Sequence, residues 1–507
     1  MPCVLLLALY FQGSHGDIVT FENAQVKQPE YLEVPKYAPS DVPHWAPGRG
    51  KSYIDLSAIS VAQDCGSTCT PISFLDIIIF EDTSSVSSWM EHWGPEKQFC
   101  CSKDMAERKE CPASEIGSLH VPYSLHGVYK MRVNVTSTSP VLLAHTNAIT
   151  HLDIQRTGLY IIVLAVCATD SSPVVLNGVI DSLDPYGYLP ADEFGDLPFY
   201  GSLALAHTLI AVIWAAICFF YMKDLMFLQL WISIVLAMGM IETTMFFAYY
   251  LDWNDSGAYS LGLLTVALVM GVVKRMISRL LVLVISLGYG VVRPSLGDDL
   301  RKVVFLGIAY FVLSLVYTLT TSFPDSDQRK AVDEDTMDLM AVVIIMMMAV
   351  EAIFYFWIFK SLGSLMDSLA AKRQAAKYQL YRGFQGALIF SLLLTCGLGL
   401  FTIVETTMGS PDKEWEDNWL NDGYWELAYF VVFTAIAFFF APSNNNQRYA
   451  YSAQLNTSDE DETEQLTNVD SAEAEVDAEY GGKLDDGDDP FAGGGALDPK
   501  QAVLKKA

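Results

Sequence analysis

The stretch GAYSLGLLTVALVMGVVKRMISRLLVLVISLGYGV, residues 257–291, decides the fold because it combines a long apolar run with buried charge. A helix needs roughly 20 apolar residues to cross a bilayer, and this run is longer than that. Near its middle stand Lys274, Arg275 and Arg279. A charge at the bilayer centre costs roughly 2.5–3.5 kcal/mol, so partners, water or a ligand must offset all three. We therefore expect a membrane bundle with a polar interior.

Other apolar stretches surround this one. Together they predict seven membrane spans, at about 199–222, 226–250, 257–291, 302–322, 337–360, 383–408 and 424–441. Three spans contain an acid that can face the cations: Glu242 in the second, Glu351 in the fifth and Glu405 in the sixth. The third span, read as one helix, is roughly 52 Å long against a hydrocarbon core of about 30 Å. We expect it to tilt or to project from the membrane.

Basic residues are distributed unevenly between the loops that seven spans create. With the N-terminus in the lumen, ten Lys and Arg residues fall on the cytoplasmic side and three in lumenal loops. The positive-inside rule favours this orientation. The sequence therefore predicts a lumenal N-terminus and a cytoplasmic C-terminus.

The region before the spans has the pattern of a soluble, β-rich lumenal domain. Residues 1–16 are typical of a signal peptide, because an apolar run is followed by small residues. Short β-branched runs separated by Pro, Gly and Ser then predict an all-β sandwich over residues 17–195. Asn134 begins an N-glycosylation sequon in this domain, and Asn254 begins another on the lumenal side of the second span.

The cysteines before the first span are even in number, which suggests disulfides in a secretory compartment. They are Cys65, Cys69, Cys100, Cys101, Cys111 and Cys167. Spacing leaves all fifteen pairings open, and Cys167, in a strand-like run, can instead be a buried thiol. A zinc site is the weaker interpretation, because no histidine stands at ligand spacing.

The C-terminal segment, residues 443–507, is polar, Gly-rich and acidic, so it predicts a disordered cytoplasmic tail. Ser458 lies in a sequence that suits an acid-directed kinase, and Asp489-Pro-Phe491 is similar to a clathrin-adaptor motif. The alternative is a tail that only increases solubility. A formal net charge of −28 argues against nucleic acid as a partner.

Catalytic motifs are missing from the sequence. It contains no His-Glu-x-x-His, nucleophile elbow or phosphate loop, and His207 is the single histidine in the spans. We therefore expect no enzyme. The Gly288-Tyr-Gly290 tripeptide resembles part of a potassium filter, but such a filter needs four loops around one pore, and here the tripeptide is expected to end the third helix.

Several motifs resemble a known family. Asp184-Pro-Tyr-Gly-Tyr-Leu-Pro190 and Leu197-Pro-Phe-Tyr-Gly201 resemble the entry into the first span of the GOST family, also called the lung seven-transmembrane receptor family. The family usually has Asn in place of Asp184. Gly239-Met-Ile-Glu242, Val273-Lys-Arg275 and Pro442-Ser-Asn-Asn-Asn-Gln-Arg448 resemble its transmembrane protein 87 branch.

The resemblance implies a GOLD-like lumenal β-sandwich followed by a seven-helix bundle in the Golgi membrane. The resemblance also implies that the helical bundle is similar in architecture to that of the carrier of lipidated Wnt proteins. The roles implied for this branch are endosome-to-Golgi retrograde transport, chaperoning of cargo or lipid, and cation conduction.

Our leading hypothesis is that the charged cavity binds a lipid or a lipidated or membrane cargo during trafficking. Lys274, Arg275 and Arg279 would hold an anionic headgroup, with Glu242 positioning them. We expect no cofactor other than a bound phospholipid, and trafficking adaptors as partners of the tail. The alternatives are a gated cation channel with Glu242 in its path, an adaptor or receptor without cavity function, and a salt-bridge cluster that only fixes helix packing.

Overall fold

The computed structural model describes residues 18–442 except for 27–29, 43–49, 64–72, 82–99, 110, 120–127, 136–139, 146–149, 168–173, 290–291, 293–296, 298, 323–333 and 409–417. The predicted signal peptide and tail, with Ser458, Asp489 and Phe491, lie outside the described residues. Cys65 and Cys69 lie outside them as well.

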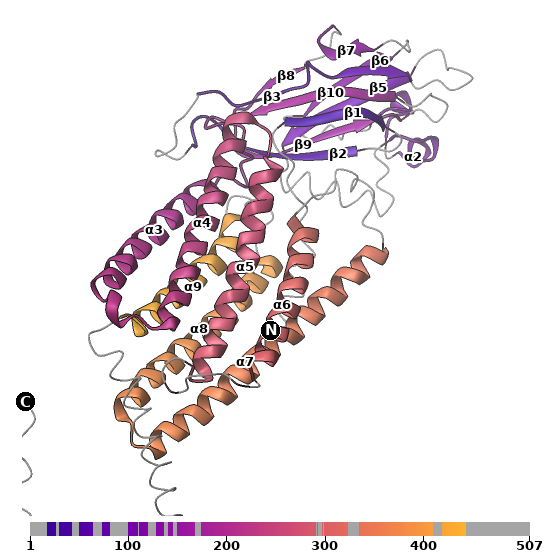
Figure 1. The fold of residues 1–507 in the computed structure, drawn as a ribbon. Coiled ribbons are helices and arrows are strands. Elements are labelled where there is room, and N and C mark those ends of the chain that lie inside the picture. Colours follow the sequence, from indigo (N-terminus) through magenta and orange to yellow (C-terminus); the bar gives the residue numbers. More distant parts are fainter. Residues whose placement is uncertain are drawn as a thin grey trace, which may run out of the picture. The chain divides into compact units, whose positions relative to one another are not determined.

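The described part of the N-terminal region forms two antiparallel sheets (Figure 1). The first has the order β7-β4-β10-β3-β8, with β1 also paired to β10, and the second has the order β2-β9-β5-β6. The strands are β1 (Ile18–Val26), β2 (Glu30–Lys36), β3 (Tyr53–Asp55), β4 (Ser60–Gln63), β5 (Ser73–Glu81), β6 (Tyr129–Val135), β7 (Val141–Leu142), β8 (His151–Asp153), β9 (Gly158–Ala165) and β10 (Val174–Leu183).

The two sheets share one apolar core, as a β-sandwich requires. In β6 the residues Met131, Val133 and Val135 are buried while their neighbours are exposed, which is the alternation expected of a strand with one face in the core. The core joins side chains of both sheets, among them Ile54, Val61, Leu176, Ile77, Val133 and Ile162. The predicted all-β domain is therefore confirmed.

A disulfide-bonded segment covers the outer face of β5. It contains α2 (Lys103–Glu107) and the short helix η3 (Ala113–Glu115), and it is closed by disulfides Cys100–Cys167 and Cys101–Cys111. Leu119 packs in a second apolar cluster that includes Ile78 of β5. Both faces of β5 are therefore buried, and the described cysteines of this domain are paired, Cys167 included.

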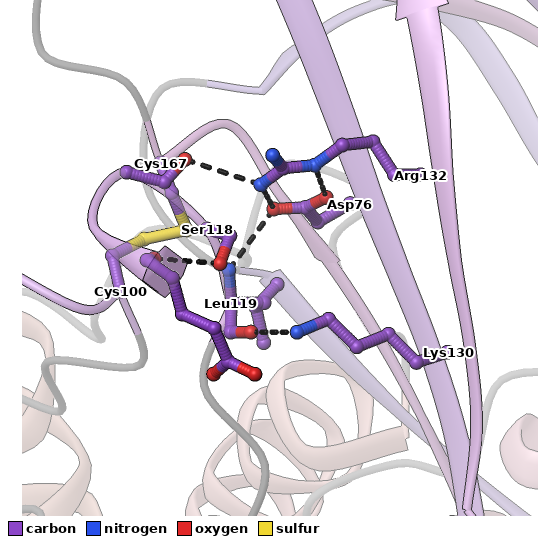
Figure 2. The surroundings of a disulfide bond; sticks show 9 residues. Asp76, Cys100, Ser118, Leu119, Lys130, Arg132 and Cys167 are labelled. Atoms are coloured by element: carbon purple, nitrogen blue, oxygen red, sulfur yellow. Dashed lines mark hydrogen bonds and ion pairs between the residues drawn. A yellow bond between two sulfur atoms is a disulfide. The ribbon is translucent and has the colours of Figure 1, made fainter. Parts of the chain in front are cut away.

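One buried acid ties this segment to the sheet (Figure 2). Asp76 accepts two hydrogen bonds from the Arg132 guanidinium, at 2.6 and 2.8 Å, and one from the backbone N–H of Leu119 at 3.0 Å. Its side chain is almost completely buried. A buried carboxylate is stable only when its oxygens are satisfied, and these donors satisfy both of them.

Seven long helices follow in the part of the chain that the structure describes. They are α3 (Asp196–Phe220), α4 (Phe227–Ser256), α5 (Leu261–Ser286), α6 (Asp299–Ser322), α7 (Glu334–Ala371), α8 (Ala375–Met408) and α9 (Asn418–Phe439). Five of them, α3, α4, α6, α7 and α8, are long and apolar enough to cross a membrane. In α5 the three cations interrupt the apolar run, and the apolar part of α9 is the shorter stretch Gly423–Phe439. Each helix corresponds to one predicted span.

The third span is shorter than its hydropathy predicts. Helix α5 has 26 residues, or about 39 Å. It ends before Gly288, whose φ of 81° lies in the left-handed region that favours glycine at helix ends. The expectation of one continuous helix through the cations is confirmed, but the predicted bounds of 257–291 were too wide, because apolar residues continue on both sides of the helical segment.

The segment between β10 and α3 contacts the end of α4. Asn254 Nδ2 donates to the carbonyl of Tyr186 at 3.1 Å, and its Oδ1 accepts from the N–H of Leu189 at 3.3 Å. Asn254 is only 7% exposed. Glycosylation at Asn254 conflicts with this placement, because a glycan would occupy the buried Nδ2 atom. Asn134 is exposed on β6, and its glycosylation stays a prediction.

A second buried ion pair lies beside this contact. Lys36 Nζ, at the end of β2, is 2.8 Å from Asp184 Oδ2, and both side chains are completely buried. The other oxygen of Asp184 accepts from the N–H of Tyr37 at 2.8 Å. The acid that replaces the usual Asn of the motif is therefore matched here by a lysine.

Candidate functional site

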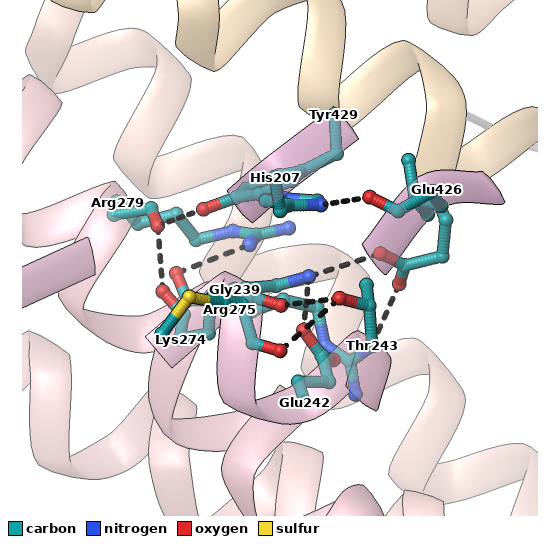
Figure 3. Close-up of polar contacts among 12 residues, drawn as sticks. His207, Gly239, Glu242, Thr243, Lys274, Arg275, Arg279, Glu426 and Tyr429 are labelled. Carbon is teal, nitrogen blue, oxygen red and sulfur yellow. Dashed lines mark hydrogen bonds and ion pairs between the residues drawn. The ribbon is translucent and has the colours of Figure 1, made fainter. Parts of the chain in front are cut away.

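The cations of α5 face a polar cluster inside the helical bundle (Figure 3). Helix α5 packs against α4, α6 and α7, so its middle is surrounded by other helices. Lys274 is completely buried, and its ammonium group contacts Glu242 of α4 and lies 2.9 Å from Glu426 Oε2 of α9. Two acids from helices far apart in sequence therefore offset this charge.

Aromatic and hydroxyl groups of α9 complete the surroundings of Lys274. Its Nζ lies 4.3 Å from the centre of the Tyr429 ring, within the range of a cation–π interaction. The Tyr429 hydroxyl is 2.5 Å from Ser278 Oγ, which donates to the Lys274 carbonyl at 2.6 Å. These contacts link α9 to the turn of α5 that carries the cations.

Two glycines allow the helices to approach closely. A Cβ atom at Gly271 of α5 would stand 2.3 Å from Glu242 Oε1. A Cβ atom at Gly239 of α4 would stand 2.9 Å from Nε2 of His207, a buried residue of α3. The Nδ1 atom of His207 is 3.1 Å from the Leu203 carbonyl, so the single histidine of the spans packs beside the cluster.

The two arginines are less buried and differ in how they are paired. Arg279 forms a two-point contact with Glu351 of α7, in which Nε donates to Oε2 at 3.1 Å and Nη2 contacts Oε1. Its guanidinium also lies 4.5 Å from the centre of the Tyr310 ring. Arg275 Nη1 is 3.8 Å from Glu426 Oε1, which is the longest ion pair of the cluster. The Arg275 side chain is 31% exposed.

The structure thus brings together most of the predicted site residues. Glu242, Lys274 and Arg275 share one network, and Arg279 and Glu351 form a second contact on α5. Glu405 lies in α8, but its side chain falls outside what the structure describes. The acid that sequence analysis missed is Glu426, which stands near the start of the last apolar run.

The cluster is balanced in formal charge. Three cations, Lys274, Arg275 and Arg279, meet three acids, Glu242, Glu351 and Glu426. Moving charges out of water is costly, and ion pairs repay that cost only with good geometry. Among the described residues no group of three His, Cys, Asp or Glu side chains is placed to hold a metal ion. The arrangement can therefore hold charge in an apolar bundle and receive a charged group at Arg275.

Comparisons with known proteins agree with this architecture. The profile of the GOST seven-transmembrane domain matches residues 196–447, a range that begins where α3 begins. Transmembrane protein 87A of Xenopus tropicalis is 29% identical over 377 residues, which cover 73% of this chain and 65% of that protein. Transmembrane protein 87B of Mus musculus is 31% identical over 314 residues, covering 62% of this chain and 55% of its own.

A fungal relative is more distant. Membrane protein PTM1 of Saccharomyces cerevisiae is 26% identical over 343 residues, which cover 64% of this chain and 63% of that protein. The chain thus spans about half to two thirds of the length of these relatives. With the seven helices and the matched domain together, this multi-pass membrane protein belongs to the GOST family of seven-transmembrane proteins.

Proposed function

We propose that this membrane protein acts in endosome-to-Golgi traffic and that its intramembrane cluster binds the headgroup of a lipid or of a lipidated cargo. Golgi residence and retrograde transport rest on the family resemblance. A lumenal N-terminus and a cytoplasmic C-terminus rest on the distribution of basic residues. We also propose that the protein is not an enzyme. Its acidic tail would bind trafficking adaptors.

The observation that carries the headgroup proposal is that Arg275 is more loosely paired than the other two cations of α5. Lys274 is held by two acids, and Arg279 engages both oxygens of Glu351. Arg275 stands at mid-helix, keeps 31% of its side chain exposed and has a long ion pair. A guanidinium offers five N–H donors, and its fork matches the oxygens of a phosphate. A phosphate-bearing headgroup next to Arg275 would satisfy donors that Glu426 does not reach closely.

The proposal is tested by measuring bound lipid on the purified full chain. The variant R275Q keeps a polar side chain but removes the charge and the guanidinium donors. We expect R275Q to lower the ratio of co-purified phospholipid to protein severalfold. Lys302 of α6 is the matched control, because it is a basic residue with 68% of its side chain exposed and it pairs with Asp299. K302Q should leave the ratio unchanged, and an unchanged ratio for a folded R275Q protein would disprove the proposal.

A gated cation channel is the second candidate. The observation in its favour is that Glu242 and Glu426 bring two carboxylates to the middle of the bundle. Lys274 lies between them, so a cation pathway there would first require this ion pair to open. Voltage-clamp recording in a planar bilayer, with E242Q alongside, separates the two candidates. A current that E242Q changes favours the channel, whereas silence with stoichiometric lipid favours the headgroup site.

A further inference from the structure

Gly271 leaves the space that the carboxylate of Glu242 occupies, and we call this arrangement the seating of Glu242. One oxygen of its carboxylate, Oε1, lies over Gly271, and the other, Oε2, contacts Lys274. Glu242 is 1% exposed, so bulk solvent does not reach its carboxylate. Any side chain at position 271 would occupy the space that Oε1 now fills, because a Cβ atom there would be 2.3 Å away.

Glu426 divides its two carboxylate oxygens between two cations. Glu426 Oε2 lies 2.9 Å from Lys274, while its Oε1 faces Arg275 at 3.8 Å. With Glu242 in place, Lys274 forms ion pairs with two acids, and one oxygen of Glu426 still faces Arg275. Two cations and two acids then meet between α4, α5 and α9, so this part of the cluster has no net formal charge.

Displacing Glu242 would change that balance. A carboxylate moved away from its cation in an apolar setting takes up a proton, because an isolated buried charge is costly. Lys274 would then depend on Glu426 alone, and the local set would have a net charge of +1. Arg275 would present less compensated charge to a headgroup.

We propose that Gly271 is a positioning residue that seats Glu242 on Lys274 and thereby limits the preference of the Arg275 site for anionic headgroups. The inference rests on the proposed headgroup binding and deepens it. With Gly271 present the site is neutral and does not select lipids with a net negative charge. Without the seat the site becomes cationic and selects them.

The substitution G271A is expected to move the carboxylate and to leave the fold intact. The atom that blocks a Cβ at position 271 is the far end of a flexible side chain, and alanine forms helices better than glycine does. Gly262, in the same helix, supplies the matched control, because a Cβ there would meet nothing within 4 Å. The variant E242Q removes the same charge without adding volume.

The experiment reconstitutes the full chain in vesicles of equal parts phosphatidylcholine and phosphatidylserine and then quantifies the lipid retained on extraction. We expect G271A and E242Q each to raise the ratio of retained phosphatidylserine to phosphatidylcholine roughly three- to tenfold, the size expected for one gained charge near a headgroup. G262A should leave the ratio unchanged. The double variant G271A/E242Q should match E242Q alone, because both changes act through one carboxylate.

The outcomes separate this inference from the proposed function. If R275Q leaves retained lipid unchanged, headgroup binding itself is wrong. If R275Q loses lipid but E242Q does not change the lipid ratio, binding stands and charge control by Glu242 is overturned. If E242Q raises the ratio but folded G271A behaves like G262A, the charge matters and the seating by Gly271 is overturned.

Discussion

Two completely buried lysines, one in each half of the molecule, show how differently the chain handles buried charge. Lys36 of the N-terminal domain pairs with Asp184, whose second oxygen accepts from the Tyr37 backbone. Lys274 of the bundle is held by Glu242 and Glu426, and Glu426 also faces Arg275. In the first case both carboxylate oxygens are closely engaged. In the second the acid is shared between two cations.

This difference indicates different roles. A closely matched pair fixes local structure, because any rearrangement leaves a buried charge uncompensated. A carboxylate shared by two cations can shift towards one of them when a ligand brings new charge to the other. The Lys36–Asp184 pair is therefore suited to stability, and the cluster around Lys274 is suited to the headgroup binding that we propose.

The largest expected effect breaks the pair in the N-terminal domain. D184N keeps an oxygen that can accept from Tyr37 but leaves the Lys36 charge without its carboxylate. Removing one partner of a buried pair costs about 3–5 kcal/mol, so we expect a loss of this order in unfolding free energy. Chemical unfolding followed by a spectroscopic signal of the β domain measures it. The neutral variant K36M/D184N should recover much of the loss, and a loss as large as that of D184N alone would contradict the assignment.

The two disulfides test whether covalent closure also stabilises the N-terminal domain. Cys100–Cys167 closes a sequence separation of 67 residues and Cys101–Cys111 one of 10. From loop entropy, removing the first is expected to cost about 4 kcal/mol and removing the second about 3 kcal/mol. Paired Cys→Ser variants, compared by thermal unfolding under identical conditions, measure the order. A larger loss for the short loop would show that packing of the segment 100–119 outweighs loop entropy.

The pair Arg279–Glu351 sharpens the comparison within the bundle. It joins α5 to α7 by a two-point contact, yet 28% and 15% of its side chains are exposed. We expect a coupling energy of about 1–3 kcal/mol between R279Q and E351Q, which is smaller than the effect of D184N. Melting temperatures of the two single variants and the double variant in detergent measure it. Additive losses would mean that the contact contributes no coupling.

The smallest expected effect is a pH dependence confined to the N-terminal domain. Burial raises the pKa of Tyr160 to about 12, and the nearby Glu81 charge adds to the effect. An unfolded tyrosine ionises near 10. Between pH about 10 and 12 the unfolded chain loses this proton first, so stability falls as pH rises. Tyr160 is buried in the core, and one pKa unit corresponds to about 1.4 kcal/mol, so we expect a loss of about 1 kcal/mol by pH about 11. Y160F should flatten the decline measured by unfolding between pH about 9 and about 11.

Hydropathy was sufficient to find the helices, and strand patterning was sufficient to find the β domain. The cations of α5 stood out because charge is rare in an apolar run. Glu426 did not, because it follows Tyr424 and Trp425 at the edge of the last run, where an acid reads as an interfacial residue. Its role depends on how α9 packs against α5, and spacing along the chain does not determine that.

The pairing of the cysteines likewise could not be predicted from the sequence. Cys100 and Cys101 are neighbours but bond to partners 67 and 10 residues away. Successive residues of an extended chain point to opposite sides, so the two thiols face different parts of the fold. The sequence shows that disulfides are expected, and the tertiary structure selects which of the fifteen pairings forms.

The position of Glu426 also has a consequence for biosynthesis. It stands 152 residues after Lys274, so at about 5–20 residues per second the ribosome needs roughly 8–30 s to supply it. During that interval α5 enters the membrane with Glu242 already made but with its second acid still missing. A nascent chain arrested before α9 should therefore expose Lys274 to a water-soluble amine reagent, and release of the complete chain should remove that reactivity.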